Sequence, residues 1–458
     1  MITVLNGSPK GKKSITLKFV EYLQKKYPQT QFRFFHVAQE IRSYSKGKEA
    51  WQELLDCINA SEGVIWAFPV YVFQAPAALM RFMELIGEFG LKEAFCGKYT
   101  CAISTSIHFY DNLAHDQVRS TLESMGMLYT GCFSADQSDF FIETQRHQLE
   151  VFFQDFLSAA KERRSVPRKF DGLHYTPIPY KPSKEQAKVS LKGKKVAIVA
   201  DLSGGGNIGP MVERLADAFE GGKVDVIKIQ ELNIRGGCLG CMKCAFDNVC
   251  TYGDKDDIKR VYETLMDPAD IIVYAGEVRN RYFSSAMKLF VERRFMRTHY
   301  PFMKGKQVAL LAAGPLRQNL TLYDTFEADV QVSEAHFAGA VSDEYPDAAA
   351  LDKAIDDLAA HLASLSEAGY IAPYNFLGVA GRKMFRDEVW GRYRFVFQAD
   401  HRYYKKTGFY DFPQKDWKTR IRNFFMMLSL RIPKNRRQIR NTMTGYMVKP
   451  FMDELKKI

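Results

Sequence analysis

Four of the eight cysteines in the chain lie within thirteen residues and have the spacing C-x2-C-x2-C-x5-C. They are Cys238, Cys241, Cys244 and Cys250. Three thiolates at every third position can curl around one point and a fourth can close the site, which is the arrangement that an iron–sulfur cluster needs. One structural zinc ion bound by four thiolates, or free redox-sensing thiols, would also account for the run. We favour the cluster and keep zinc as the alternative.

The cysteine run lies in the second of two similar halves of the chain. Strand-like runs in residues 1–165 centre near positions 4, 33, 66, 101 and 130, and those in residues 194–370 centre near 198, 227, 273, 309 and 339. Short apolar strands that alternate with helical periods predict α/β domains, each with a doubly wound, five-stranded parallel sheet. The offset between the halves is 194 residues for two strands and 207 to 209 for the rest. The second half therefore gains about thirteen residues after its second strand, and the cysteines lie in that insertion.

Composition divides the remainder of the chain. Residues 166–193 are rich in proline and polar side chains and predict a linker. Residues 371–458 form an extension rich in Arg, Tyr and Phe, with 20 of the 64 Lys and Arg but 7 of the 53 acidic residues. We expect this basic extension to dock on the body or on a second subunit. Contact with an anionic membrane surface is the main alternative, and nucleic acid is the least favoured partner.

The start of the chain predicts a strand and lacks the pattern of a signal peptide. No run approaches the roughly 20 apolar residues of a membrane span. We therefore expect a cytoplasmic protein, in which cysteines serve thiol or metal chemistry rather than disulfides. The four scattered cysteines are expected to be small buried residues. They are Cys57, Cys96, Cys101 and Cys132.

Ligands of an open parallel sheet bind beyond the carboxyl ends of its strands. After the first strand, the loop from Gly7 to Thr16 combines two glycines, three hydroxyls and the start of a helix, which suits a phosphate. After the third strand, residues 69–73 bring two aromatic rings and backbone amides to the same edge, which suits a flat conjugated ring. The fourth strand ends in small polar residues. The alternative for the first loop is an ordinary strand–turn–helix connection, and the alternative for the third is a packed loop with core aromatic residues.

Three segments carry a resemblance to a known family: Asn6–Lys10, Pro69–Tyr71 and the helix Ala77–Met83. They resemble the flavodoxin-like NAD(P)H-dependent FMN reductases, and the second copy with its four cysteines looks like their iron–sulfur flavoprotein branch. The resemblance implies two tandem flavodoxin-like domains, FMN, a [4Fe-4S] cluster bound by the cysteines near FMN, and NAD(P)H as electron donor. It implies cofactor contacts in the first copy at Ser8, Lys10, Ser14, Ile15, Thr16, Pro69, Val70, Tyr71, Val72, Phe73, Ser104 and Thr105. Tyr71 and His108 are the catalytic candidates, because both would lie at the ring edge.

The second copy departs from the family pattern in its first loop, where the candidate contacts are Ser203, Asn207 and Ile208. This loop contains a G-x-G-x-x-G spacing, but its register matches the phosphate loop of the first copy, so a nicotinamide site there is the weaker interpretation. FMN is therefore favoured in the first copy, and FMN in the second copy, or in both, is the alternative.

The resulting hypothesis is an FMN-dependent NAD(P)H oxidoreductase with a cluster. It would take electrons from a nicotinamide or a ferredoxin-type carrier and pass them to an unknown acceptor. The alternatives are an electron-transfer protein without a substrate of its own and a zinc-stabilised scaffold without flavin. Such flavin sites are often shared across a subunit interface, which a homodimer or the two tandem copies within one chain could form.

Overall fold

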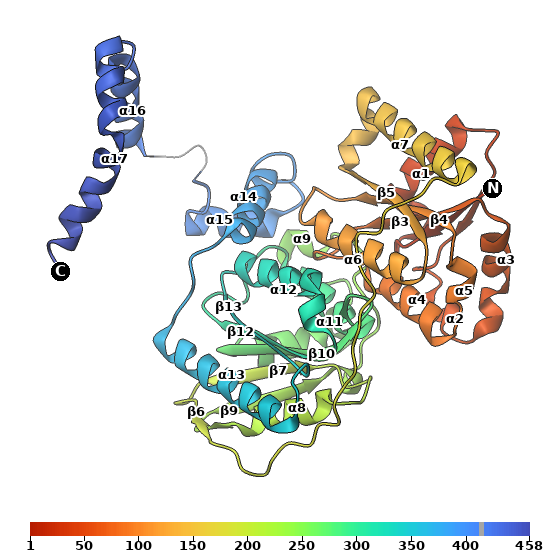
Figure 1. Ribbon diagram of the computed structural model, residues 1–458, viewed down its shortest axis with the longest axis horizontal. Helices are drawn as coiled ribbons and strands as arrows, with labels where there is room; N and C mark the ends of the chain where they lie inside the picture. Colours follow the sequence, from red (N-terminus) through yellow and green to blue (C-terminus); the bar gives the residue numbers. More distant parts are fainter. Residues whose placement is uncertain (412–415) are drawn as a thin grey trace. The chain divides into compact units, whose positions relative to one another are not determined.

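The computed structural model describes residues 1–411 and 416–458, and the part of the extension at 412–415 lies outside the described residues. The chain divides into two compact units, Met1–Tyr403 and Tyr404–Ile458. Both predicted sheets lie in the first unit, each with helices on its two faces (Figure 1).

The first sheet has five parallel strands in the order β2-β1-β3-β4-β5. Its strands are β1 (Ile2–Asn6), β2 (Phe32–Phe35), β3 (Gly63–Pro69), β4 (Tyr99–Thr105) and β5 (Leu128–Ala135). Its main helices are α1 (Ile15–Lys26), α3 (Gln52–Ala60), α4 (Ala77–Glu88), α6 (Asp111–Ser124) and α7 (Glu143–Glu162), with short helices α2 (Ile41–Tyr44) and α5 (Lys92–Phe95). The strand interiors are almost entirely buried and apolar, as expected of a parallel sheet covered on both faces.

The second sheet repeats this order as β9-β7-β10-β12-β13, with the short antiparallel strand β11 (Tyr282–Phe283) added to β10. Its strands are β7 (Lys195–Ala200), β9 (Lys223–Lys228), β10 (Ile271–Arg279), β12 (Gln307–Ala313) and β13 (His336–Ser342). Its helices are α8 (Ile208–Asp217), α10 (Ile258–Val261), α11 (Ser285–Arg293), α12 (Leu320–Val332) and α13 (Ala348–Ala368). The predicted α/β class with two tandem sheets is confirmed. The cysteine run lies between β9 and β10, where α9 (Cys244–Asp247) is its one helical turn.

The two copies share a core. One continuous cluster of buried side chains includes Trp66 and Phe82 of the first copy and Phe283 and Phe290 of the second. Separate clusters cover the outer face of each sheet. Helices α4 and α11, which follow the third strand of each copy, pack against each other in this shared region. The copies therefore meet as two halves of one folded unit.

At this interface each helix binds the first turn of the other. The Ala77 amide at the start of α4 donates to Glu292 Oε2 of α11 at 3.0 Å. The Ser285 amide at the start of α11 donates to Glu84 Oε1 of α4 at 2.6 Å. Carboxylates stabilise the positive end of a helix and satisfy its free amides. Because both pairs are related by the same offset of 208 residues, the copies meet about a pseudo-twofold axis.

The symmetry of the interface is broken by one cation. Lys288 is fully buried and lies 3.3 Å from the Glu292 carboxylate, whereas the corresponding residue of the first copy is Met80. Lys288 Nζ also donates to the Tyr71 carbonyl at 2.7 Å, and the Cys238 amide donates to Glu292 Oε1 at 2.8 Å. Burial lowers the pKa of Lys288, and the Glu292 carboxylate opposes that shift. The ion pair thus joins the third-strand loop of the first copy to the cysteine loop of the second.

The extension is helical. It consists of α14 (Phe376–Trp390), α15 (Gln398–Thr407), α16 (Trp417–Ser429) and α17 (Pro433–Leu455). Helix α14 packs on α12 of the second copy. Among the helices of the described residues, none combines the length and the apolar character needed to cross a membrane.

The prediction that the scattered cysteines are buried is wrong for three of them. Cys101 is buried in the central strand β4. Cys57 is half-buried, and Cys96 and Cys132 are exposed. Cys96 lies in the turn after a short helix, and Cys132 lies on the edge strand β5, where a side chain can reach solvent.

Candidate functional site

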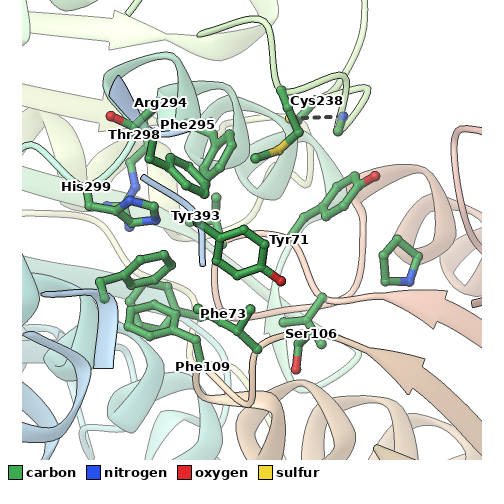
Figure 2. Close-up of a pocket in the computed structure, with 18 of the residues that line it drawn as sticks. Tyr71, Phe73, Ser106, Phe109, Cys238, Arg294, Phe295, Thr298, His299 and Tyr393 are labelled. Carbon is green, nitrogen blue, oxygen red and sulfur yellow. Dashed lines mark hydrogen bonds between the residues drawn. The ribbon is translucent and has the colours of Figure 1, made fainter. Parts of the chain in front are cut away.

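A cavity of about 400 Å³ lies beyond the carboxyl ends of the first sheet (Figure 2). The strand-end loops of the first copy form one wall, and the cysteine loop and the segment after α11 form the second. The extension forms the third. The predicted cofactor residues that line this cavity are Lys10, Ile15, Pro69, Val70, Tyr71, Val72, Phe73 and Thr105. The others of the first copy are buried and do not line it: Ser8, Ser14, Thr16 and Ser104.

The buried hydroxyls organise the loop after β1. Ser14 caps α1, since its hydroxyl accepts from the Leu17 amide at 3.4 Å. The Thr16 hydroxyl lies 2.6 Å from that of Thr105 and ties the loop to β4. Lys10, which lines the cavity, and the amides at the start of α1 then remain for an anion. This end of the cavity fits a phosphate by charge and by donor geometry.

The loop after β3 turns sharply beneath the cavity. Val72 and Phe73 both have positive φ, at 46° and 67°. The Tyr71 amide donates to the Gln74 carbonyl at 2.8 Å, and the Gln74 amide donates back at 3.3 Å. The turn presents the Tyr71 and Phe73 rings to the cavity (Figure 2). Burial raises the pKa of Tyr71, so its hydroxyl stays protonated at neutral pH.

The four predicted metal ligands line one smaller cavity, together with Tyr252, Arg293 and Met296. Arg293 Nη2 lies 3.9 Å from Cys250 Sγ. In the part of the chain that the structure describes, no group of three or more His, Cys, Asp or Glu side chains is placed to hold a metal ion. The thiols of Cys238, Cys241, Cys244 and Cys250 instead surround an apolar space.

The two cavities share a wall. Cys238, Met242 and Phe295 line both of them. Gly240 makes the close approach of the loops feasible, because it has a φ of +59° and a Cβ there would collide with the Tyr71 hydroxyl. Figure 2 shows Cys238 beside Tyr71, with the Gly240 amide donating to the Cys238 sulfur at 3.4 Å. A group in the smaller cavity would therefore lie next to a group in the larger one.

Side chains from the extension close the large cavity. They are Phe385, Tyr393, Val396 and Phe397. Arg392 anchors this segment to the first copy through two bonds to the Asp136 carboxylate, at 2.6 and 2.9 Å. Asp400 anchors it to the second copy by accepting from the Thr298 hydroxyl at 2.8 Å and the His299 amide at 3.0 Å. Both copies and the extension are therefore needed to complete the cavity.

The corresponding edge of the second copy is occupied by the linker. Asn207 donates to the Ile178 carbonyl at 2.8 Å and accepts from the Tyr180 amide at 3.1 Å. Its amide also donates to the Asp343 carboxylate at 2.8 Å. Ser203 lies exposed in the same loop, and Ile208 is buried at the start of α8. Carboxylates and backbone thus meet the loop where the first copy offers lysines.

His108 lies outside the cavity lining and half exposed, with its Nδ1 2.9 Å from Asp111 Oδ2. The hydrogen bond to Asp111 raises the pKa of His108. Sequence reasoning missed the segment Arg294–Phe302 and the aromatic residues of α14 and the loop after it. The aromatic richness of the extension was the available signal, but it did not indicate which cavity those rings would close.

Comparison with known proteins follows the two copies. The family model for NADPH-dependent FMN reductase matches residues 1–139 and 194–326, which is more than half of the chain. The chain belongs to the NADPH-dependent FMN reductase family. It is therefore an NAD(P)H-dependent flavin oxidoreductase that uses FMN, built from a tandem duplication of the flavodoxin-like fold.

Solved structures similar to this member of the FMN reductase family each cover about one copy. An NADH:FMN oxidoreductase (EMOB) in its apo form is 24% identical over 34% of this chain and 88% of its own, with a TM-score of 0.30. The flavoenzyme NAD(P)H:acceptor oxidoreductase FerB from Paracoccus denitrificans is 19% identical over 35% of this chain and 97% of its own, with a TM-score of 0.30. An FMN-dependent NADH-azoreductase from Bacillus anthracis is 13% identical over 35% and 98%, with a TM-score of 0.25. No curated protein matches the chain significantly.

Proposed function

We propose that this reductase holds FMN in its first copy and a [4Fe-4S] cluster on Cys238, Cys241, Cys244 and Cys250, so that electrons pass between the two groups. The observation that carries the proposal is the wall that both cavities share. Cys238 lines the large cavity beside Tyr71 and also lines the small one. Bound FMN would take up a hydride from NAD(P)H, and a cluster would accept electrons one at a time.

The residues of the large cavity fit FMN. Lys10 and the start of α1 would hold the phosphate, and the backbone of Tyr71 to Phe73 would meet the edge of the ring system. A volume of about 400 Å³ with several aromatic rings in its walls is within the usual range of cofactor pockets. In the second copy, Asp343 and the linker lie against the loop that would have to bind a phosphate. Charge and space both favour the first copy.

The spacing of the four cysteines favours a cluster over zinc. The four ligands of one zinc ion must lie about 2.3 Å from a single point. Three of the cysteines recur at every third position, which resembles cluster ligation more than the paired ligands of a zinc knuckle, and all four line one cavity of about 20 Å³. Cluster thiolates bind different irons and therefore stand farther apart. Arg293, beside Cys250, would offset part of the negative charge of the ligands.

The nicotinamide is the proposed electron donor, and the aromatic roof formed by Phe385, Tyr393 and Phe397 would exclude water from the reacting ring. Tyr71 would act as a neutral hydrogen-bond donor, since burial keeps its hydroxyl protonated. His108 lies off the cavity, so Tyr71 is the stronger of the two catalytic candidates.

The test is anaerobic purification followed by assays of flavin, iron, acid-labile sulfide and zinc. We expect one FMN and four irons per chain, and loss of iron with retention of FMN in Cys244→Ala. Cys132→Ser, an exposed cysteine outside the motif, is the matched control and should keep both cofactors. Zinc in place of iron, or FMN without any iron, would refute the cluster. Iron without FMN would refute the flavin site in the first copy.

A further inference from the structure

The last two helices of the second unit, α16 and α17, expose their apolar side chains. Among its described side chains in α16 and α17, none is buried. Large apolar side chains are exposed instead, with Trp417 at 65%, Phe425 at 63% and Met427 at 70%. Apolar surface on this scale marks a contact site, because monomeric proteins rarely leave it in water.

Four of the exposed apolar side chains of α16 follow one side of the helix. Trp417, Ile421, Phe424 and Leu428 recur at i, i+4, i+7 and i+11, which places them on a single helical face. All four are exposed. In α17 the apolar side chains gather in the C-terminal half, where Met443, Met447, Val448, Phe451, Met452 and Leu455 are exposed. We refer to these exposed apolar residues of α16 and α17 as the apolar ridge.

Basic side chains flank the apolar ridge. Residues 416–458 contain eleven Lys and Arg but three Asp and Glu. Arg420 and Arg422 lie on α16, and Arg437 and Arg440 lie in the basic first half of α17. The unit therefore combines a linear apolar face on α16 and exposed apolar side chains on α17 with a concentrated positive charge.

We propose that this unit lies on the surface of an anionic lipid membrane, with the apolar ridge inserted between the headgroups and the basic side chains at the lipid phosphates. A helix with an apolar face and a basic polar face binds in the plane of such a surface without crossing it. Trp and Phe along the ridge suit the headgroup boundary. The finding that no described helix could span a membrane agrees with this in-plane placement.

The other occupants fit the charges or the ridge, but not both. A double-stranded nucleic acid would pair with the arginines and leave the Phe424 and Phe425 rings in water. A second copy of the chain could cover the ridge, but it would bring two strongly positive surfaces together. An anionic bilayer satisfies the apolar and the charged surface at once.

The test uses the full-length protein and two kinds of vesicle, one of pure phosphatidylcholine and one of equal parts phosphatidylcholine and phosphatidylglycerol. We expect co-sedimentation with the anionic vesicles, weakened by added salt. Arg437→Ala with Arg440→Ala should weaken binding about twenty-five-fold, at about fivefold per basic residue. Ile421→Ser with Phe424→Ser should abolish it.

Controls separate insertion from simple charge attraction. Asn423→Ser changes the polar side of α16 and should bind as the unmodified protein does. Binding should shift the emission of Trp417 to shorter wavelength, and Trp417→Phe should remove that shift while retaining binding. The proposal is overturned if the protein ignores anionic vesicles or binds both kinds equally. It is also overturned if a nucleic acid binds more tightly than anionic vesicles, or if the ridge variants convert a dimer to a monomer.

Discussion

The buried ion pair of α11, which lies at the interface of the two copies, makes two pseudo-symmetric substitutions unequal in cost. Glu292→Gln removes the partner of Lys288, which is fully buried and has no other anion within ion-pair distance among the described residues. Stranding a buried charge in this way costs about 3–5 kcal/mol. Glu84→Gln is the pseudo-symmetric change, but its cation Arg81 is 34% exposed and keeps Glu88 at 2.6 Å. We expect that change to cost about 1–2 kcal/mol.

The assay is urea unfolding followed by circular dichroism, with the same interface perturbed in each variant. Glu292→Gln should lower the free energy of unfolding by about 2 kcal/mol more than Glu84→Gln does. Adding Lys288→Met to Glu292→Gln removes the stranded cation and places at that position the residue that the first copy uses. Most of the loss should be recovered. Equal costs for Glu292→Gln and Glu84→Gln, or a double variant no more stable than Glu292→Gln, would show that the ion pair does not hold the copies together.

Three further predictions concern the site and its surroundings. Gly240→Ala should weaken FMN binding at least tenfold more than the control Gly253→Ala, which also has a positive φ but has open space at its Cβ. Adding Tyr71→Phe to Gly240→Ala should recover part of the lost affinity, and no recovery would contradict the proposed collision. Arg392→Met should raise the dissociation constant for FMN about tenfold, because it releases the aromatic roof of the cavity from the Asp136 carboxylate. An unchanged dissociation constant in a flavin-fluorescence titration would argue against that anchor. Burial lowers the pKa of His115 to about 4, so the unfolded chain binds a proton at this residue more readily than the folded chain does. The free energy of unfolding should therefore fall by up to about 3 kcal/mol as the pH drops from 6.5 to 4, and His115→Gln should flatten that dependence in urea titrations.

The sheets could be predicted because their signals are local. Apolar runs with short helices between them locate strands, and a constant offset reveals the duplication without any knowledge of contacts. The 208-residue offset between Gly63 and Ile271, the starts of the third strands, also fixes where the extra residues enter, which is why the cysteine insertion falls between β9 and β10.

The completed cavity could not be predicted, because its walls meet through contacts that are distant in the sequence. Tyr393 reaches the Gln137 side chain across 256 residues, at 2.8 Å. A run of aromatic residues in the sequence does not indicate which surface of the protein those rings cover. The exposed cysteines could not be predicted for a similar reason. Residue type predicted that Cys132 is buried, but its position on an edge strand leaves it exposed.

The interface between α4 and α11 joins two copies of one fold within a single chain. In a homodimer of separate chains, such an interface would dissociate on dilution. Every mutation would also appear on both sides of the twofold axis. Here the partner is tethered, so its effective concentration is fixed by the linker and does not depend on the amount of protein. The two sides are also free to diverge, as Lys288 opposite Met80 illustrates. One copy can then keep its ligand-binding site while the other copy serves to stabilise it, and both are encoded in a single chain.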